Sequence, residues 1–325
     1  MKIFVTGGTG FIGRYTTELL SKTNHQVKLL VRKSSNTASL RYPNITFVEG
    51  DLKNKDSILK GMDGCDSVIN IAGHYTFWEP HKRIYSDVNI NGTKNVLECA
   101  LDTGIKKVVH ISTAGIYGKP KDEPFNEMSQ VGPVQYSEYF RTKYEGDKIA
   151  WDLFEKRNLP LVVIYPVCVL GAGDTKASRR YISDLINREL PAMIFKNDVF
   201  SFVYVKDVAQ AILNASEKEN NIGEKYLVGN YRCTWHEFNK MISEISDVPL
   251  HKFYLPDFIT MLNAYLLTGL ANLIKKPPLW GMAIDQMKVM KAGFNVDGSK
   301  AERELGIKYT PIRLALEEAI KSIIS

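Results

Sequence analysis

The stretch TGGTGFIG, residues 6–13, decides the fold class. Three of its four glycines recur at every third position, at Gly7, Gly10 and Gly13. The loop follows the apolar run KIFVT and precedes the helix-like segment GRYTTELLSKT. In a dinucleotide-binding loop the first glycine permits a tight turn, the second lets backbone amides approach a diphosphate, and the third allows close helix–strand packing. The amides of the first helical turn, at Phe11 and Ile12, would face the anion. A glycine-rich turn without a ligand is the alternative, which the strand and helix on either side disfavour.

Short apolar runs alternate with helical patterns through the first half of the chain. We predict strands over residues 2–7, 26–32, 44–51, 67–73, 106–113 and 160–171. We predict helices over residues 13–23, 56–62, 88–104 and 137–157. The strands are apolar on both faces, as in a parallel sheet covered on both sides. The alternation therefore predicts an α/β fold with a doubly wound parallel sheet of the Rossmann type.

The pattern loosens after residue 171. Residues 201–217 predict a strand and a helix that return to the sheet, and residues 224–229 predict a further strand. We expect a dinucleotide-binding domain over residues 1–170, which also receives about residues 200–230. Residues 171–199 and 231–325 would form a smaller, mostly helical substrate domain at the carboxyl edge of the sheet, where ligands bind in open α/β folds.

Composition narrows the classes of partner. The 325 residues carry 42 Lys and Arg against 36 Asp and Glu, a net charge of +6, without a dense basic run. The charge pattern therefore predicts neither a nucleic-acid nor an anionic-lipid surface, and favours a small-molecule substrate. The four cysteines are widely spaced and show no metal-site spacing, so we predict free thiols, no metal and a cytoplasmic protein.

The longest apolar segment covers residues 255–274. Asp257, Asn263, Gly269 and Asn272 interrupt it, whereas a membrane span needs about 20 nearly uninterrupted apolar residues. We therefore predict no transmembrane segment and favour a buried or lid helix, with contact to a membrane surface as the minor alternative. The first residues run directly into the glycine loop, so we expect no signal peptide.

The end of the second predicted strand bears on the choice of cofactor. An NAD site usually offers an Asp or Glu there to hold the adenosine 2′-hydroxyl. Here the strand ends in Arg32, Lys33 and Ser34. A guanidinium suits a 2′-phosphate, through charge-assisted hydrogen bonds. The sequence therefore favours NADP, with NAD and a merely solvent-facing arginine as the alternative.

The segment YSEYFRTKYEG, residues 136–146, places three tyrosines around one lysine. Tyr139 lies four residues before Lys143, so the two side chains are neighbours on one helix face. Tyr136 lies about 10.5 Å from Lys143 along the axis, and Tyr144 points elsewhere. A nearby ammonium lowers a phenol pKa from about 10, which makes tyrosine an acid–base group. The alternative is a solvated surface pair.

Two hydroxyls follow the fifth predicted strand, in HISTAGIYG. Ser112 or Thr113 lies at the carboxyl end of that strand, where either could orient a substrate oxygen toward Tyr139. The alternative is a turn or capping hydroxyl.

Several motifs in order resemble the extended short-chain dehydrogenase/reductases, the NAD-dependent epimerase/dehydratase family, along nearly the whole chain. They are TGGTGFIG, VEGDL, NIAG, VNINGTKNVLECA, HISTAGIYG, YFRTK, YPVCVLGAGD, SFVYVKDVA and NVDGSKAERELG. HYTFWEP, GAGDTKASR and the AERELG tail resemble the dihydroflavonol-reductase-like branch.

This resemblance implies roles for individual residues. Tyr139 would be the catalytic acid–base, Lys143 would bind the nicotinamide ribose and lower the tyrosine pKa, and Thr113 would position the substrate oxygen, with Ser112 as the fallback. Further cofactor contacts would come from Asp51, Leu52, Ala72, Gly73, Asn89, Pro166 and Val169. Substrate would face His74, Tyr75, Trp78, Lys176, Arg179 and Tyr204. The resemblance also implies a homodimer through the helices that carry Asn89 and Tyr139.

The sequence departs from the resembling families at two places, and these differences favour one of the possible reactions. Sugar 4,6-dehydratases carry an Asp–Glu pair after the catalytic threonine, whereas Ala114 and Gly115 follow Thr113. Epimerases retain NAD and usually show the acidic strand end that this chain lacks. We therefore favour an NADPH-dependent carbonyl reductase. A nucleotide-sugar epimerase and a non-catalytic NADP-binding sensor or scaffold are the alternatives.

Overall fold

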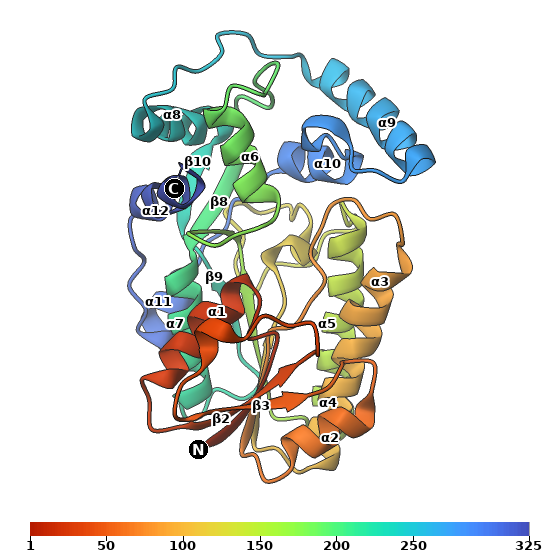
Figure 1. Cartoon of the computed structure of the whole chain (residues 1–325), viewed down its shortest axis with the longest axis vertical. Helices are drawn as coiled ribbons and strands as arrows, with labels where there is room; N and C mark the ends of the chain where they lie inside the picture. Colours follow the sequence, from red (N-terminus) through yellow and green to blue (C-terminus); the bar gives the residue numbers. More distant parts are fainter. Residues whose placement is uncertain (325) are drawn as a thin grey trace.

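Seven parallel strands form the larger sheet, in the order β3-β2-β1-β4-β5-β6-β9 (Figure 1). The structure is a computed structural model that describes residues 1–324. The strands are β1 (Lys2–Thr6), β2 (Gln26–Val31), β3 (Ile45–Glu49), β4 (Ser67–Asn70), β5 (Lys107–Ile111), β6 (Leu161–Pro166) and β9 (Lys225–Val228). The predicted doubly wound α/β fold is confirmed.

Helices cover both faces of this sheet (Figure 1). One face carries α1 (Phe11–Ser21) and α7 (Val205–Glu217), and the other carries α2 (Lys55–Met62), α4 (Thr93–Asp102) and α5 (Glu138–Arg157). Short turns connect them: α3 (Arg83–Tyr85), a π-helical turn (Ser86–Gly92), and 3₁₀ turns at Ala38–Leu40 and Ala114–Tyr117. Because both faces are covered, every residue of β4 and β6 is buried, as the continuous apolar runs predict.

A second group of elements lies beyond the carboxyl ends of these strands (Figure 1). It contains a three-stranded sheet, β10-β8-β7, made of β7 (Cys168–Leu170), β8 (Val199–Tyr204) and β10 (Tyr231–Thr234). Its helices are α6 (Ala177–Ile186), α8 (Trp235–Ser246), α9 (Asp257–Ile274), α10 (Ile284–Ala292) and α12 (Ile312–Ile324), with a 3₁₀ turn at Leu279–Gly281. The smaller helix α11 (Ser299–Leu305) lies against β9 and α7.

Three details of the predicted order are corrected. The strand expected over residues 160–171 is divided into β6, which ends at Pro166 in the large sheet, and β7, which joins the small one. Proline has no amide hydrogen to continue the ladder. Residues 201–217 were predicted to form a strand and a helix that return to the large sheet. The strand is β8, and it lies in the small sheet, where it pairs with β10 and β7. The helix expected to begin at residue 88 starts instead with the π-helical turn Ser86–Gly92.

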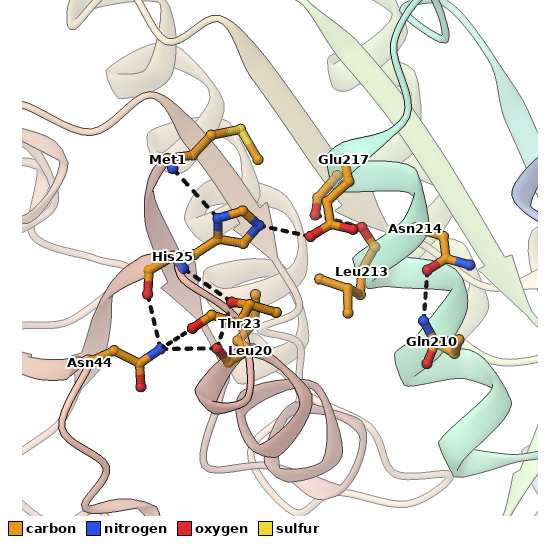
Figure 2. Close-up of polar contacts among 10 residues, drawn as sticks. Met1, Leu20, Thr23, His25, Asn44, Gln210, Leu213, Asn214 and Glu217 are labelled. Carbon is orange, nitrogen blue, oxygen red and sulfur yellow. Dashed lines mark hydrogen bonds and ion pairs between the residues drawn. The ribbon is translucent and has the colours of Figure 1, made fainter.

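The returning helix α7 does join the large sheet, and a polar contact fastens its end (Figure 2). His25, at the start of β2, lies with its Nε2 2.8 Å from Oε1 of Glu217, near the end of α7. The side-chain amide of Asn44 donates to the carbonyl oxygens of Leu20, Thr23 and His25. The turn between α1 and β2 is therefore held to both β3 and α7.

Candidate functional site

A cavity of about 690 Å³ lies between the carboxyl ends of β1, β4, β5 and β6 and the second group of elements. The large sheet contributes the glycine loop and the ends of the strands. The second group contributes residues of α6, β8, α8 and α10, including Lys176, Phe202, Trp235 and Met290. This is the switch-point position where open α/β folds bind ligands.

The glycine loop lines one end of the cavity and has the geometry that a diphosphate requires. Gly7 has a positive φ of 74°, and a Cβ there would lie 2.5 Å from the amide nitrogen of Ala72. A Cβ on Gly13 would lie 2.0 Å from the Gly7 oxygen. Helix α1 begins at Phe11, and Gly10 before it provides no side-chain cap. The first amides of α1 therefore remain available to an anion, so these residues fit a dinucleotide.

The adenosine end of the cavity is lined by Arg32, Ser35, Asp51 and Leu52. Arg32 follows β2 and is exposed, and its backbone amide donates to the Ser35 hydroxyl over 3.1 Å. The Asp51 carboxylate accepts from the amide of Lys53 over 2.9 Å. The predicted cofactor residues Ile12, Ala72, Gly73, Pro166 and Val169 also line the cavity.

Tyr139 and Lys143 both reach the cavity from α5. Ser137 caps this helix by accepting from the amide of Phe140 over 3.1 Å, so the helix begins at Glu138, directly before Tyr139. The Tyr139 ring lies 4.9 Å from the Tyr75 ring, edge to face. The Lys143 ammonium donates to the carbonyl oxygen of Ile111, at the end of β5, over 2.8 Å.

Burial controls the protonation of this pair. It lowers the pKa of Lys143 to about 8 and raises the pKa of Tyr139 above its usual value of 10. The expectation that Lys143 lowers the pKa of Tyr139 is therefore not met in this structure, because desolvation of the phenolate dominates. Tyr139 is a neutral phenol at neutral pH and so can donate a proton.

A buried carboxylate lies one helical turn beyond Lys143. Burial raises the pKa of Asp147 to about 6. The negative charge of Asp147 partly offsets the lowering of the Lys143 pKa by burial. The Tyr165 hydroxyl donates to Asp147 over 3.1 Å, and the Trp151 indole donates to the Tyr165 oxygen over 3.0 Å. Sequence analysis missed Asp147, although its spacing of four residues from Lys143 predicts a shared helix face.

Both candidate hydroxyls line the cavity. The Thr113 oxygen accepts from the amide of Gly115 over 3.2 Å, which leaves its own proton available for donation. The Ser112 oxygen is buried and makes no hydrogen bond of normal geometry within residues 1–324, but its hydroxyl lies close enough to the Asp147 carboxylate to lower the pKa of that group. The local structure thus fixes Thr113 in place and keeps Ser112 as a second candidate.

The predicted substrate residues separate into two sets. His74, Tyr75 and Lys176 line the cavity. The other three predicted residues form hydrogen bonds away from the cavity. The Trp78 indole donates to Asn272 over 3.0 Å, and the Arg179 guanidinium donates to the Ser322 carbonyl over 3.1 Å. The Tyr204 hydroxyl donates to Glu318. Trp78, Arg179 and Tyr204 do not line the cavity.

Asn89 acts behind the cavity wall rather than on it. Its side-chain oxygen accepts from the amide of His74 over 2.8 Å, and its nitrogen donates to the Thr142 hydroxyl over 3.1 Å. Asn89 therefore joins the loop after β4 to α5 and holds the wall that carries Tyr139.

An aromatic cluster at the other end of the cavity was missed by sequence analysis. Its members line the cavity and come from five separate segments: Phe140, Tyr181, Phe200, Phe202, Trp235, Phe238 and Phe294. The Phe202 and Phe238 rings stack at 4.4 Å, and Phe200 contacts Phe294 at 4.8 Å. No local pattern signals this cluster, because its members are up to 154 positions apart.

The covered parallel sheet and its glycine loop define the class as Rossmann-type dinucleotide-binding enzymes. The chain belongs to the NAD dependent epimerase/dehydratase family, whose model matches residues 3–229. This confirms the predicted family.

Individual relatives cover the chain almost completely. The chain is 28% identical over 324 residues to the “putative dihydroflavonol 4-reductase” of Synechocystis sp., covering 98% of this chain and 93% of the relative. It is 27% identical to sterol demethylase protein B of Methylococcus capsulatus, covering 98% and 97% of the two chains. The crystal structure of gox2253 has a TM-score of 0.83 at 26% identity, covering 99% of this chain and 97% of that one.

Proposed function

We propose that the protein is an NADPH-dependent reductase of an apolar ketone or aldehyde. The observation that carries this proposal is the aromatic cluster, which lines the cavity together with Tyr139 and Phe140. A nucleotide sugar would need cations for its diphosphate. Among the described residues that α6, β8, α8 and α10 contribute to the cavity, Lys176 is the one cation. An apolar carbonyl compound matches this wall better.

The reaction follows from the protonation states of the chain's own residues. Bound NADPH would supply a hydride to the carbonyl carbon. The neutral Tyr139 phenol donates its proton to the carbonyl oxygen, which completes the alcohol. Thr113 donates a hydrogen bond that positions that oxygen. Lys143, one helical turn further along α5, would hold the ribose.

The preference for NADP is supported by the wall around the adenosine end. Arg32 lines this end, and no Asp or Glu occurs among the last residues of β2 or in the Arg32–Ser35 turn. The guanidinium could form bidentate, charge-assisted hydrogen bonds with a 2′-phosphate.

The alternative is a nucleotide-sugar epimerase that uses the same Tyr139, Thr113 and Lys143. The family description favours it, since it names epimerases and NAD. The two reactions differ in their use of the cofactor: an epimerase retains NAD⁺ through the cycle, whereas a reductase exchanges NADPH at each turnover. Release of tightly bound NAD⁺ on denaturing the purified protein would favour the epimerase.

The first test is Tyr139→Phe, assayed by NADPH oxidation against a panel of apolar ketones and aldehydes. We expect kcat/KM to fall about 10²- to 10⁴-fold, the usual contribution of a general acid. NADPH binding, measured by fluorescence titration, should stay within about twofold of the wild type.

Tyr144→Phe is the matched control, because Tyr144 lies on the same helix and outside the cavity lining. It should keep full activity. Equal activity of Tyr139→Phe and the wild type would contradict the proposed reaction and favour a non-catalytic NADP-binding role.

We further propose the domain division given above, with residues 1–170 and about 200–230 binding the cofactor and the rest binding substrate. The cavity wall contributed by α6, α8 and α10 supports it, whereas β7 and β8 belong by residue number to the cofactor part but pair in the small sheet of the second group.

A further inference from the structure

Helix α9 presents an almost entirely apolar face to solvent. Within its 18 residues only Thr260, Ala264 and Ala271 are buried. Seven of its large apolar side chains are between 48% and 80% exposed: Phe258, Leu262, Tyr265, Leu266, Leu270, Leu273 and Ile274. Their spacing of three or four residues places them along one side of the helix. Figure 1 shows α9 at the outer edge of the molecule, with α10 on its inner side.

We expected a buried or lid helix over residues 255–274, and the exposed side chains contradict the buried alternative but do not test the lid alternative. Composition predicted the helix, but it could not show which elements would cover it. Apolar side chains on this scale, gathered on one face, are unusual for a surface that meets only water.

The charged side chains along α9 and the turn after it are positive, apart from one acid at each border of this segment. No Asp or Glu occurs over residues 258–284, whereas Lys275 and Lys276 are exposed at the end of α9. The two acids that border this segment are engaged: Asp257 pairs with Lys291 at 2.5 Å, and Asp285 accepts from the amide of Glu138 over 2.9 Å. Leu279 and Trp280, directly after the lysines, are also exposed.

We propose that α9 is an interfacial membrane helix that docks the protein on a bilayer containing anionic lipid. Apolar side chains would enter the boundary between headgroups and acyl chains, and Lys275 and Lys276 would lie at the level of the phosphates. The sequence lacks a long basic run, and so predicted no anionic-lipid surface. The structure places two lysines at the end of an apolar face, where such a run is not needed.

The helix lies on the membrane rather than across it. By length and composition alone α9 could cross a bilayer. However, its Asn272 accepts from the Trp78 indole over 3.0 Å, and its Thr268 accepts from the amide of Ile284 over 2.8 Å. These contacts and the buried Ala264 and Ala271 fix one side of the helix to the rest of the protein.

The hydrogen bond between Trp78 and Asn272 links α9 to the cavity wall. Trp78 follows the segment that contributes His74, Tyr75 and Phe77 to the cavity wall. An apolar substrate dissolved in the bilayer would then enter close to α9. This part of the inference rests on the proposed reduction of an apolar carbonyl, whereas the membrane contact itself does not.

Flotation with lipid vesicles tests the docking. The full-length protein is mixed with vesicles of phosphatidylcholine alone or of phosphatidylcholine with an equal amount of phosphatidylglycerol. We expect it to float with the anionic vesicles, and less as salt is raised. The triple variant Leu262→Asn/Leu266→Asn/Leu270→Asn should lose flotation with both kinds of vesicle.

A second variant tests the charges. Lys275→Gln/Lys276→Gln should weaken binding to anionic vesicles about tenfold and leave the weak binding to phosphatidylcholine unchanged. The matched controls are Leu314→Asn, a half-exposed leucine on α12, and Lys119→Gln/Lys121→Gln, two exposed lysines outside this surface. Both should float like the wild type.

Two results would overturn the proposal. One is wild-type protein that stays with the unbound fraction for both kinds of vesicle. The other is a stable dimer, seen by light scattering, that the triple variant converts to monomers, since α9 would then be covered by a second copy. Circular dichroism of every variant checks that it is folded, so these results do not depend on whether the proposed reaction or cofactor is right.

Discussion

Burial, rather than the neighbouring ammonium, sets the protonation state of Tyr139. Its phenol is neutral in this cavity, and the nearby Lys143 is itself shifted to a pKa of about 8. A neutral phenol suits reduction, in which tyrosine must give up a proton to the carbonyl oxygen.

Asp147 carries a testable pH dependence of stability. Its pKa is about 6 in the folded protein against 3.8 as a free side chain, so the folded state binds more protons between these values. Wild-type stability should therefore fall relative to Asp147→Asn as pH rises from about 3 to about 7, by about 3 kcal/mol. Urea unfolding at several pH values measures this difference.

Asp152→Asn is the control for this comparison, since Asp152 lies on the same helix and is largely exposed. Its stability difference from the wild type should stay nearly constant over that range. If Asp147→Asn behaved in the same way, the carboxylate would not be buried as described.

The two hydroxyls after β5 should differ in their effects. Thr113→Val removes the hydroxyl that we assign to the substrate oxygen, so kcat/KM should fall about 10²-fold, and Thr113→Ser should restore most of it. Ser112→Ala should lower kcat/KM less than about tenfold. A larger loss in Ser112→Ala than in Thr113→Val would transfer the positioning role to Ser112.

Among the elements, the end of β2 carries the test of the proposed preference for NADP. Arg32→Ser should raise the KM for NADPH by about 10- to 100-fold, the range expected for losing a hydrogen bond to a charged group, and leave the KM for NADH unchanged. Lys33→Ser is the control, because Lys33 is exposed and outside the cavity lining. Unchanged NADPH kinetics in Arg32→Ser would make Arg32 a solvent-facing residue and remove the support for NADP.

Elements with a local signal could be predicted from sequence. The glycine loop, the apolar strands and the Tyr139–Lys143 spacing each depend on residues close together in the chain, and the structure brings them to one cavity. The division of residues 160–171 into β6 and β7 could not be predicted, because it depends on β8, about 30 residues further along. The exposure of α9 depends in the same way on which elements cover it.

At the scale of the whole molecule, the substrate wall is formed by tertiary structure alone. Phe140, Trp235 and Phe294 meet because α5, α8 and the segment after α10 converge over the sheet. Trp78, Arg179 and Tyr204 match sequence motifs, yet their polar groups bond to Asn272, Ser322 and Glu318. The residues chosen from sequence motifs thus line the glycine-loop end of the cavity more completely than its aromatic end. The cytoplasmic location and the homodimer stay predictions.

The central claim is that hydride passes from NADPH to an external apolar carbonyl compound. The most direct measurement uses NADPH that carries deuterium at both hydrogen positions of nicotinamide C4, with mass spectrometry of the products. If the proposed reduction takes place, we expect alcohols that carry one deuterium on the former carbonyl carbon, with stoichiometric release of NADP⁺. Epimerised nucleotide sugars formed with retained NAD⁺, and no deuterium in any alcohol, would contradict it.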